Sequence, residues 1–206
     1  MANTQSQFGF QHFGYLPGFA PDYQQIPLSI QSTYSTVIGY GDPVIKVASG
    51  SSYIIQATAA LATASPLSGI FLGCQITPST GLGIPQWSPW YPGAQSVDSV
   101  AYVMASPGAL FRVAVLQTAI VTANIGQGVN FTTSGLTVTT KGSGYSIMTV
   151  DQATLATSAS NTTMVNSPFK VYSMFPGIGN GSDPTTNFNW VIVAFNQQQW
   201  KSMAAF

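Results

Sequence analysis

Short stretches in which apolar and polar residues alternate occupy most of the chain after about residue 31. Every second side chain in such a stretch can face a core while its neighbours face solvent, which is the period of a half-buried strand. Gly, Pro, Asn and Ser separate the stretches and predict turns between them. The pattern predicts strands over residues 34–40, 43–48, 52–57, 69–76, 99–104, 110–116, 128–131, 135–140, 145–150, 168–174 and 189–195.

Helical periodicity is weak throughout the chain. The best candidate covers residues 151–159, where Asp151 would cap the first turn, but the segment is rich in Thr and Ser, which weaken helix interiors. Strands of this length and spacing, without helices between them, are typical of antiparallel folds. We therefore expect an all-β protein, an antiparallel barrel or a jelly-roll-like sandwich, with one or two short helices at most.

The first thirty residues differ from the rest of the chain in their prolines and aromatic side chains. Pro17, Pro21 and Pro27 exclude a helix and disfavour a central strand. The sequence thus predicts an extended arm over residues 1–30 and a single β domain over residues 31–206. The rings of the arm either fold back over the protein's own core or reach a neighbouring subunit. These rings belong to Phe8, Phe10, Phe13, Tyr15, Phe19 and Tyr23.

A second aromatic cluster lies in a long loop rich in Pro and Gly, residues 78–93. Three interpretations are open for the aromatic residues Trp87, Trp90 and Tyr91. They form a buried cluster that closes the barrel, they anchor a protein interface, or they stack on sugar rings. Exposed tryptophans in a groove with polar partners would favour a sugar, whereas burial at a subunit contact would favour a protein.

The charge content excludes several classes of partner. The 206 residues include five Lys or Arg and five Asp, so that 5% of the chain is charged and the net charge is zero; an ordinary domain is roughly a quarter charged. Single, scattered Lys residues cannot neutralise a run of phosphates, so we expect neither nucleic acid nor an anionic membrane as a partner. Ser, Thr and Gly take the place of charges, a composition that suits an assembly.

The residues available for catalysis are few. The one histidine, His12, lies in the arm, and the one cysteine, Cys74, lies in a predicted buried strand, so we assign no Cys–His pair and no intrachain disulfide. A glycoside hydrolase needs two facing carboxylates, and Asp98 and Asp151 have no evident partner. We expect no enzyme, no catalytic residue, no metal site and no cofactor.

Residues 177–181 read Gly-Ile-Gly-Asn-Gly and superficially match a phosphate-binding loop. Such a loop presents its phosphate to the start of a helix, and here Ser182, Asp183 and Pro184 follow instead. We interpret the segment as a flexible loop. The start of the chain has neither a basic nor an apolar leader region, and no stretch has the eighteen or so apolar residues of a membrane span, so we expect synthesis in a cytoplasm.

Short motifs follow one another in a fixed order along nearly the whole chain. They are Gly9-Phe10, Leu16-Pro17-Gly18, Gln25-Ile26-Pro27, Gly41-Asp42-Pro43-Val44, Gly69-Ile70-Phe71-Leu72-Gly73-Cys74, Trp90-Tyr91-Pro92, Ala101-Tyr102-Val103, Phe111-Arg112-Val113, Ala123-Asn124-Ile125-Gly126, Pro168-Phe169-Lys170-Val171 and the closing Trp190-Val191-Ile192-Val193-Ala194-Phe195-Asn196. In this order they resemble a family of tailed-bacteriophage virion proteins, the structural cement or capsid decoration proteins. The scarcity of charge departs from the family, so salt bridges cannot be a major part of any contact with a shell.

The resemblance implies a non-enzymatic clamp on the capsid surface of a virion, made in the host cytoplasm. Such a protein binds the major capsid protein where subunits meet and stabilises the expanded head; we also expect a homo-oligomer, a dimer or a trimer. Residues 1–30 and the 78–93 loop would carry these contacts, and a chain without residues 1–24 would fold but no longer decorate shells. The alternative is a head-fibre or tail accessory module that binds a carbohydrate or receptor through the Trp-rich loop.

Overall fold

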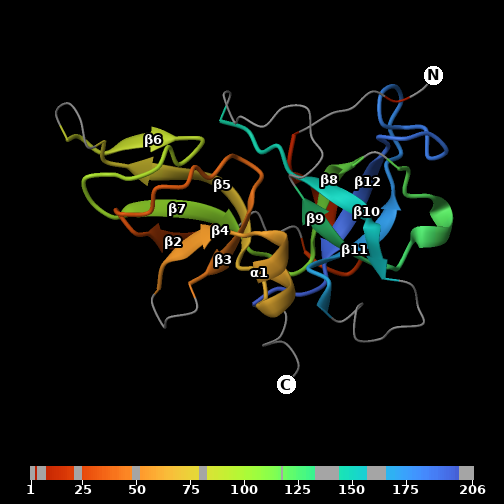
Figure 1. The fold of residues 1–206 in the computed structure, drawn as a ribbon, viewed down its shortest axis with the longest axis horizontal. Helices are drawn as coiled ribbons and strands as arrows, with labels where there is room; N and C mark the ends of the chain where they lie inside the picture. The colour runs from red at the N-terminus through yellow and green to blue at the C-terminus, as the bar shows by residue number, and fades with distance from the viewer. Residues whose placement is uncertain are drawn as a thin grey trace.

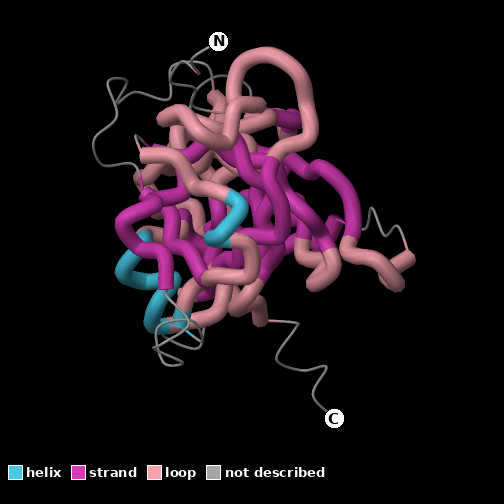
Figure 2. The backbone as a smooth tube through the Cα atoms, turned by 90° about the vertical axis from the view of Figure 1, so that its right-hand side faces the viewer, coloured by secondary structure: helices cyan, strands magenta, loops and turns pink. Residues whose placement is uncertain are grey.

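The computed structural model describes residue 3 and residues 8–20, 25–47, 52–78, 83–116, 118–132, 144–156 and 166–199. The named helical elements are α1 (Ala59–Ala64) and the 3-10 turn η1 (Thr122–Asn124), and strands prevail in the described residues (Figure 2). The strands are β1 (Gln11–Tyr15), β2 (Gln25–Ile30), β3 (Pro43–Lys46), β4 (Ile54–Gln56), β5 (Gly69–Ile76), β6 (Gln86–Ser88), β7 (Ser99–Met104), β8 (Ala109–Leu116), β9 (Gly128–Thr132), β10 (Thr149–Ala156), β11 (Phe169–Met174) and β12 (Trp190–Phe195).

Five strands from the second half of the chain close into a barrel. Antiparallel pairings join β8 to β12, β12 to β11, β11 to β9 and β9 to β10. A parallel pairing of β10 with Val115 and Leu116 of β8 completes the ring. β1 pairs with the earlier part of β8, opposite residues 109–112. The interior holds buried apolar side chains from each barrel strand, among them Phe111, Phe131, Val150, Phe169 and Val193.

The second sheet lies beside the barrel along the longest axis of the molecule (Figure 1). Its strand order is β2-β7-β5-β3-β4, and β6 pairs with β5 beyond the end of β3. A parallel bridge from Ser29 to Tyr53 links the two outer strands, so the sheet curls around a core of its own. This core includes Ile30, Val44, Phe71, Tyr91 and Val103.

The barrel and the second sheet share one apolar cluster. Ile45 and Ile70 of the second sheet belong to the same buried cluster as Phe111 of the barrel. The chain that follows β12 adds hydrogen bonds across the junction. The buried Gln198 donates from Nε2 to the carbonyl oxygen of Ala105 at 2.9 Å, and Gln199 N donates to the carbonyl oxygen of Leu67 at 2.8 Å.

The expected all-β class is confirmed, and a closed barrel with a second antiparallel sheet is the form that it takes. Strands β3, β4, β5, β7, β8, β9, β11 and β12 lie on predicted stretches. The strand predicted at 145–150 begins only at Thr149. The strand predicted at 135–140 lies outside the described residues. β1, β2 and β6 were not predicted, because prolines precede, interrupt or follow them.

Two predicted elements are wrong. Residues 34–40 form only isolated bridges, Ile38 with Tyr91 and Tyr40 with Tyr145, because Gly41 turns the chain with a φ of 88°. Residues 151–156 belong to β10 and not to a helix. The Thr residues of this segment suit a strand better than a helix, and Asp151 accepts a hydrogen bond from Ala153 N at 3.0 Å within the strand.

The first thirty residues take part in both sheets, since β1 pairs with β8 and β2 pairs with β7. Phe10, just before β1, is fully buried in the barrel core. Its ring stacks on Phe169 at 4.3 Å between centroids and meets Phe131 edge-on at 6.2 Å. The expectation that the chain folds without residues 1–24 is therefore corrected, because the truncation removes a core side chain and a paired strand.

Candidate functional site

The nine residues expected at an interface divide into buried and exposed ones. Phe10 and Tyr91 are fully buried, and Phe8 and Tyr15 are half-buried. Tyr23 lies outside the described residues. The candidate interface thus narrows to the exposed rings of Phe13, Phe19, Trp87 and Trp90.

Tyr91 holds its loop against the second sheet. Its hydroxyl donates to the carbonyl oxygen of Tyr34 at 2.9 Å, and the two rings stack at 6.1 Å. Burial raises the pKa of Tyr91 to about 12, so the hydroxyl stays protonated and keeps this bond at any physiological pH. Tyr91 therefore fixes the backbone next to Trp90 instead of meeting a partner.

Trp87 lies on the outer face of the second sheet and is 57% exposed. Its six-membered ring rests on Gly73 of β5, where an added Cβ would come within 2.5 Å of the ring. Tyr102 of β7 packs beside it, with 5.4 Å between ring centroids. Because the sheet backs one side of the indole, Trp87 offers the rest of its surface to solvent in a fixed orientation.

Trp90 is supported in the same manner on a different segment. Its indole lies against Gly144, which has a φ of 75° and leaves no room for a Cβ. Ser88, buried between the two tryptophans, exchanges hydrogen bonds with the Trp90 backbone. Tyr145 follows Gly144 and is exposed. We refer to these four rings together as the tryptophan patch, which has one part on the sheet, Trp87 with Tyr102, and another on different segments, Trp90 with Tyr145.

Phe8 contacts its own chain. The Arg112 guanidinium lies 5.2 Å from the centroid of Phe8, 4.9 Å from that of Trp190 and 5.3 Å from that of Phe175, and it donates a hydrogen bond to Gln11. A cation among three rings is a stabilising arrangement in itself. Phe8 and Arg112 therefore fasten the start of the chain to the barrel.

A second exposed apolar surface covers the outside of the barrel. Leu16 and Phe175 pack on a small outer cluster of Leu110, Ile192 and Ala194. Phe13 meets Phe175 edge-on at 6.3 Å, and Ile125 and Tyr172 are exposed nearby, beside a hollow that they share with Leu16. We call this surface the barrel patch: Phe13, Leu16, Ile125, Tyr172 and Phe175.

The hollow in the barrel patch has a volume of about 400 Å³. Most of its lining is apolar, and of the described residues that line it only Lys170 carries a charge. The lining consists of Leu16, Ile125, Gly126, Lys170, Val171, Tyr172, Ala194 and Phe195. A hollow of this size and lining suits an apolar group, and Lys170 would favour an anionic group beside it.

The side chains that could act in catalysis lie on different parts of the molecule. His12 belongs to β1 of the barrel and Cys74 to β5 of the second sheet, so the structure does not pair them. Burial lowers the pKa of His12, against an opposing hydrogen bond to the Gly14 backbone, and raises the pKa of the Cys74 thiol to about 12. At neutral pH Cys74 is thus a buried thiol, the unreactive form.

Asp98 is the acidic residue with the most defined surroundings. It accepts hydrogen bonds from the Tyr53 hydroxyl at 2.6 Å and from Ser32 N at 2.9 Å, which hold the pKa of its carboxyl below the usual value. This ionised carboxylate ties two loops together. In the described part of the chain, no three His, Cys, Asp or Glu side chains gather where a metal ion could bind.

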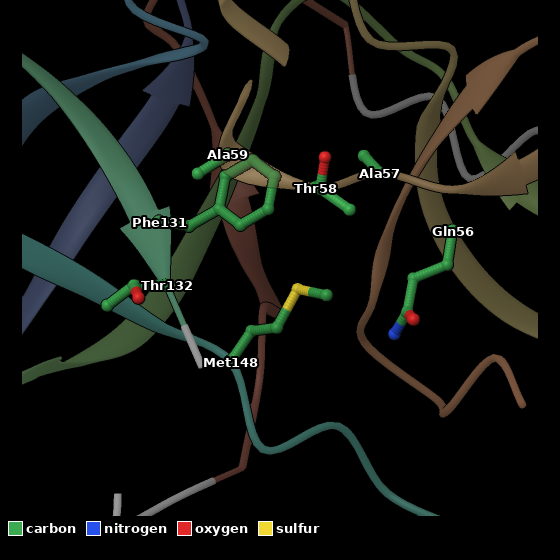
Figure 3. A pocket seen from close by; sticks show the side chains of 7 residues that line it. All are labelled: Gln56, Ala57, Thr58, Ala59, Phe131, Thr132 and Met148. Atoms are coloured by element: carbon green, nitrogen blue, oxygen red, sulfur yellow. The ribbon is translucent and has the colours of Figure 1, made fainter. Parts of the chain in front are cut away.

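A smaller hollow, of about 170 Å³, lies between the two sheets. Figure 3 shows Phe131 and Met148 on one side of it and Gln56 on the other, with Thr58 between them. None of the described residues that line it is titratable at neutral pH. The hollow therefore offers shape without a reactive group. None of the helices in the described ranges has the length and apolar character needed to cross a membrane.

Sequence reasoning missed several residues of the two patches. Tyr102 lies on a predicted strand, but period-two alternation does not say which side of that strand faces out. Ile125 directly follows η1, whereas Lys170 and Tyr172 belong to β11, and only the closed barrel brings these segments together. Comparison of the chain with family models, with curated proteins and with solved structures finds no match.

Proposed function

We propose that this chain is a non-enzymatic structural protein of a bacteriophage virion, a decoration protein that binds the major capsid protein where its subunits meet and stabilises the expanded head. The observation that carries the proposal is the tryptophan patch, a rigid aromatic surface on a molecule with hardly any charge. The order of motifs along the chain supports the choice of partner.

The tryptophan patch has the properties of a protein interface. Trp and Tyr supply much of the binding free energy at protein contacts, above all where they sit on rigid elements. Gly73 and Gly144 fix the two indoles from behind, so little side-chain entropy is lost when a partner covers them. Burial of the exposed parts of Trp87 and Trp90 would contribute about 2 kcal/mol each.

The absence of a strong net charge also suits a crowded shell. Copies of a highly charged protein repel one another when they occupy neighbouring lattice sites. This chain has a net charge of zero, so many copies can bind side by side. Binding would then depend on apolar contact and hydrogen bonds from Ser and Thr.

The test is cosedimentation of the purified chain with empty expanded capsids of its own virus. We expect saturation at a simple ratio of chain to capsid protein. The double variant Trp87→Ala/Trp90→Ala should bind at least about a hundredfold more weakly, because it loses roughly 3–4 kcal/mol from buried apolar surface.

The matched control is Val121→Ala, which alters a side chain that is 40% exposed, close to the 38% of Trp90, but outside both patches. It should bind as the unaltered chain does. Absence of binding, or binding at only a few copies per particle, would overturn the proposal.

A second candidate, a carbohydrate-binding virion module, is favoured by one feature. The exposed indole of Trp87 lies next to Gln75, an exposed amide directly opposite it in the sheet. An aromatic platform with an amide at its edge can stack on a neutral sugar ring. Glycan binding that disappears in Trp87→Ala, in a chain that ignores capsids, would support this candidate instead.

A further inference from the structure

We infer that the barrel patch binds a second copy of this chain, with Ile178 of each copy entering the hollow of the other and Lys170 meeting Asp183 across the contact. This surface is separate from the tryptophan patch. In Figure 1, β6, which carries Trp87, lies at one end of the long axis, and β11 and β12 lie toward the other.

Ile178 is the most exposed large apolar side chain among the described residues, at 103% of its reference area. Gly177 and Gly179 flank it, and no residue in the described part of the chain shields it. An isoleucine in this position exposes its whole apolar surface to water, which is unfavourable unless another molecule covers it. The glycine-rich segment is thus better explained as the support of a projecting side chain than as a phosphate loop.

The loop that carries Ile178 is held in place by its own hydrogen bonds. Asn3 is buried against it, where its Oδ1 accepts from Gly181 N at 2.9 Å and its Nδ2 donates to the carbonyl oxygen of Asp183 at 2.8 Å. Trp190 N donates to the carbonyl oxygen of Gly181 at 2.8 Å. These bonds fix the segment that follows Ile178, so the side chain projects from a loop that is anchored on its C-terminal side.

The hollow supplies the complementary half of the contact. Leu16, Ile125 and Tyr172 give it an apolar lining, and its volume of about 400 Å³ accommodates a branched aliphatic side chain. Lys170 adds a positive charge to this lining. The same surface thus combines an apolar socket with an ammonium group.

The Ile178 loop also carries the matching negative charge. Asp183 accepts hydrogen bonds from Thr185 N at 2.9 Å and from the Thr185 hydroxyl at 2.6 Å. These bonds hold the pKa of the Asp183 carboxyl below its usual value, so it is ionised at neutral pH. One chain therefore carries both a projecting side chain with a carboxylate and a socket with an ammonium group.

A two-fold contact between identical chains requires that each chain carry both complementary parts, here the projecting side chain with its carboxylate and the hollow with its ammonium group. In an isologous dimer each copy gives the same patch, so every contact occurs twice. A different partner would have to supply the projecting side chain and the carboxylate from elsewhere, whereas a second copy brings both. The occupant is accordingly the chain itself.

The first experiment measures the mass of the full chain by light scattering over a range of concentrations. We expect a monomer–dimer equilibrium, and Ile178→Ser should weaken it at least about tenfold. Ile84→Ser is the matched control, since Ile84 is also a loop isoleucine, 61% exposed, in the segment that leads into β6. A chain that stays monomeric, or a dimer that Ile178→Ser leaves intact, would overturn the inference.

The second experiment exchanges the charges. Lys170→Asp and Asp183→Lys each place like charges opposite one another in a homodimer, so each variant alone should associate weakly. An equimolar mixture should form heterodimers, because both pairs are then of opposite charge. Failure of the mixture to associate would refute the Lys170–Asp183 contact. Circular dichroism serves as the control that each variant is folded.

This inference and the proposed function fail separately. Light scattering measures self-association without any capsid, whereas cosedimentation measures capsid binding through the tryptophan patch. A monomeric Ile178→Ser chain that still sediments with capsids would leave the proposed function intact, with a lower apparent affinity because two linked sites bind more tightly than one.

Discussion

At the scale of single residues, the recurring device is an aromatic ring laid on a glycine. Trp87 lies on Gly73, Trp90 on Gly144 and Trp190 on Gly181, and in each case a Cβ would collide with the indole. A flat ring can approach a glycine backbone closely because no side chain intervenes. A chain with few charges thereby orients its largest side chains by shape instead of by ion pairs.

Gly73→Ala tests this device. The new Cβ would lie 2.5 Å from the Trp87 ring, and the residue has a φ of 138°, which L side chains rarely adopt. We expect a loss of about 1–3 kcal/mol in the free energy of unfolding, measured by urea denaturation, and a change in tryptophan fluorescence. Gly14→Ala is the control, since a Cβ there meets nothing within 4 Å. Equal stability of the two variants would contradict the account.

At the scale of elements, the unusual feature is the position of β1. It is separated from its partner β8 by the whole second sheet in sequence, and it fills the part of the β8 edge that β10 leaves free. Its register shifts between His12 and Gly14, a bulge that bends the strand round the barrel. The ring of five strands closes without β1, but the β8 edge and the barrel core are complete only when the beginning of the chain has joined them.

Removal of residues 1–24 should consequently unfold or severely destabilise the protein. Phe10→Ala alone should lower the free energy of unfolding by about 3–5 kcal/mol, because it empties a position between Phe131 and Phe169. Phe13→Ala, at a site 46% exposed in the neighbouring strand, should cost less than about 1.5 kcal/mol. Thermal denaturation measures the stability of the truncated chain and of the two variants. A truncated chain as stable as the full-length chain would contradict the prediction.

The sequence predicted elements well where the apolar pattern was continuous. The 69–76 stretch is β5 because its apolar residues bury almost without interruption, and 190–195 is β12 for the same reason. It was less successful where local chemistry was ambiguous: the prolines led us to expect an extended arm, yet Pro27 lies in β2, an edge strand that pairs with β7 alone among the named strands, where a missing N–H is tolerated. Asp151 resembled a helix cap, yet tertiary pairing with β9 prevailed.

The candidate site was predictable only in part. Clustered aromatic residues in a Pro-rich loop are visible in the sequence, so Trp87 and Trp90 could be singled out. Tyr91 follows Trp90 in the sequence but turns inward. Its inward orientation depends on the hydrogen bond from its hydroxyl to the carbonyl oxygen of Tyr34, which is far away in the chain. The hollow beside Lys170 depends on strands that meet only in the closed barrel, and no local pattern encodes it.

At the scale of the whole molecule, β6, which carries Trp87, and β11, which carries Tyr172, lie toward opposite ends of the long axis of a nearly uncharged body (Figure 1). One end would bind the shell and the other a second copy, so a dimer presents two capsid-binding ends that point apart. A dimer of this kind can span two lattice sites, and the linkage raises the effective concentration of the second end.

Capsid binding should accordingly be insensitive to salt. Between 0.1 and 1 M NaCl the screening length falls from about 10 Å to about 3 Å, which weakens contacts between charges but not apolar ones. With 5% charged residues, we expect the affinity in the cosedimentation assay to change less than about threefold over this range. A decrease of tenfold or more would mean that charged groups dominate the contact.

The path of the chain through the two sheets also sets the order in which they can be completed on the ribosome. The strands of the second sheet are contiguous and have all emerged once residue 104 is free, whereas the barrel needs β12 before its ring can close. At about 5–20 residues per second, Phe10 waits roughly 8–30 s for Phe169 to be synthesised. During that interval its ring has no core to enter, so the newly made chain must protect an exposed aromatic segment until its last strands arrive.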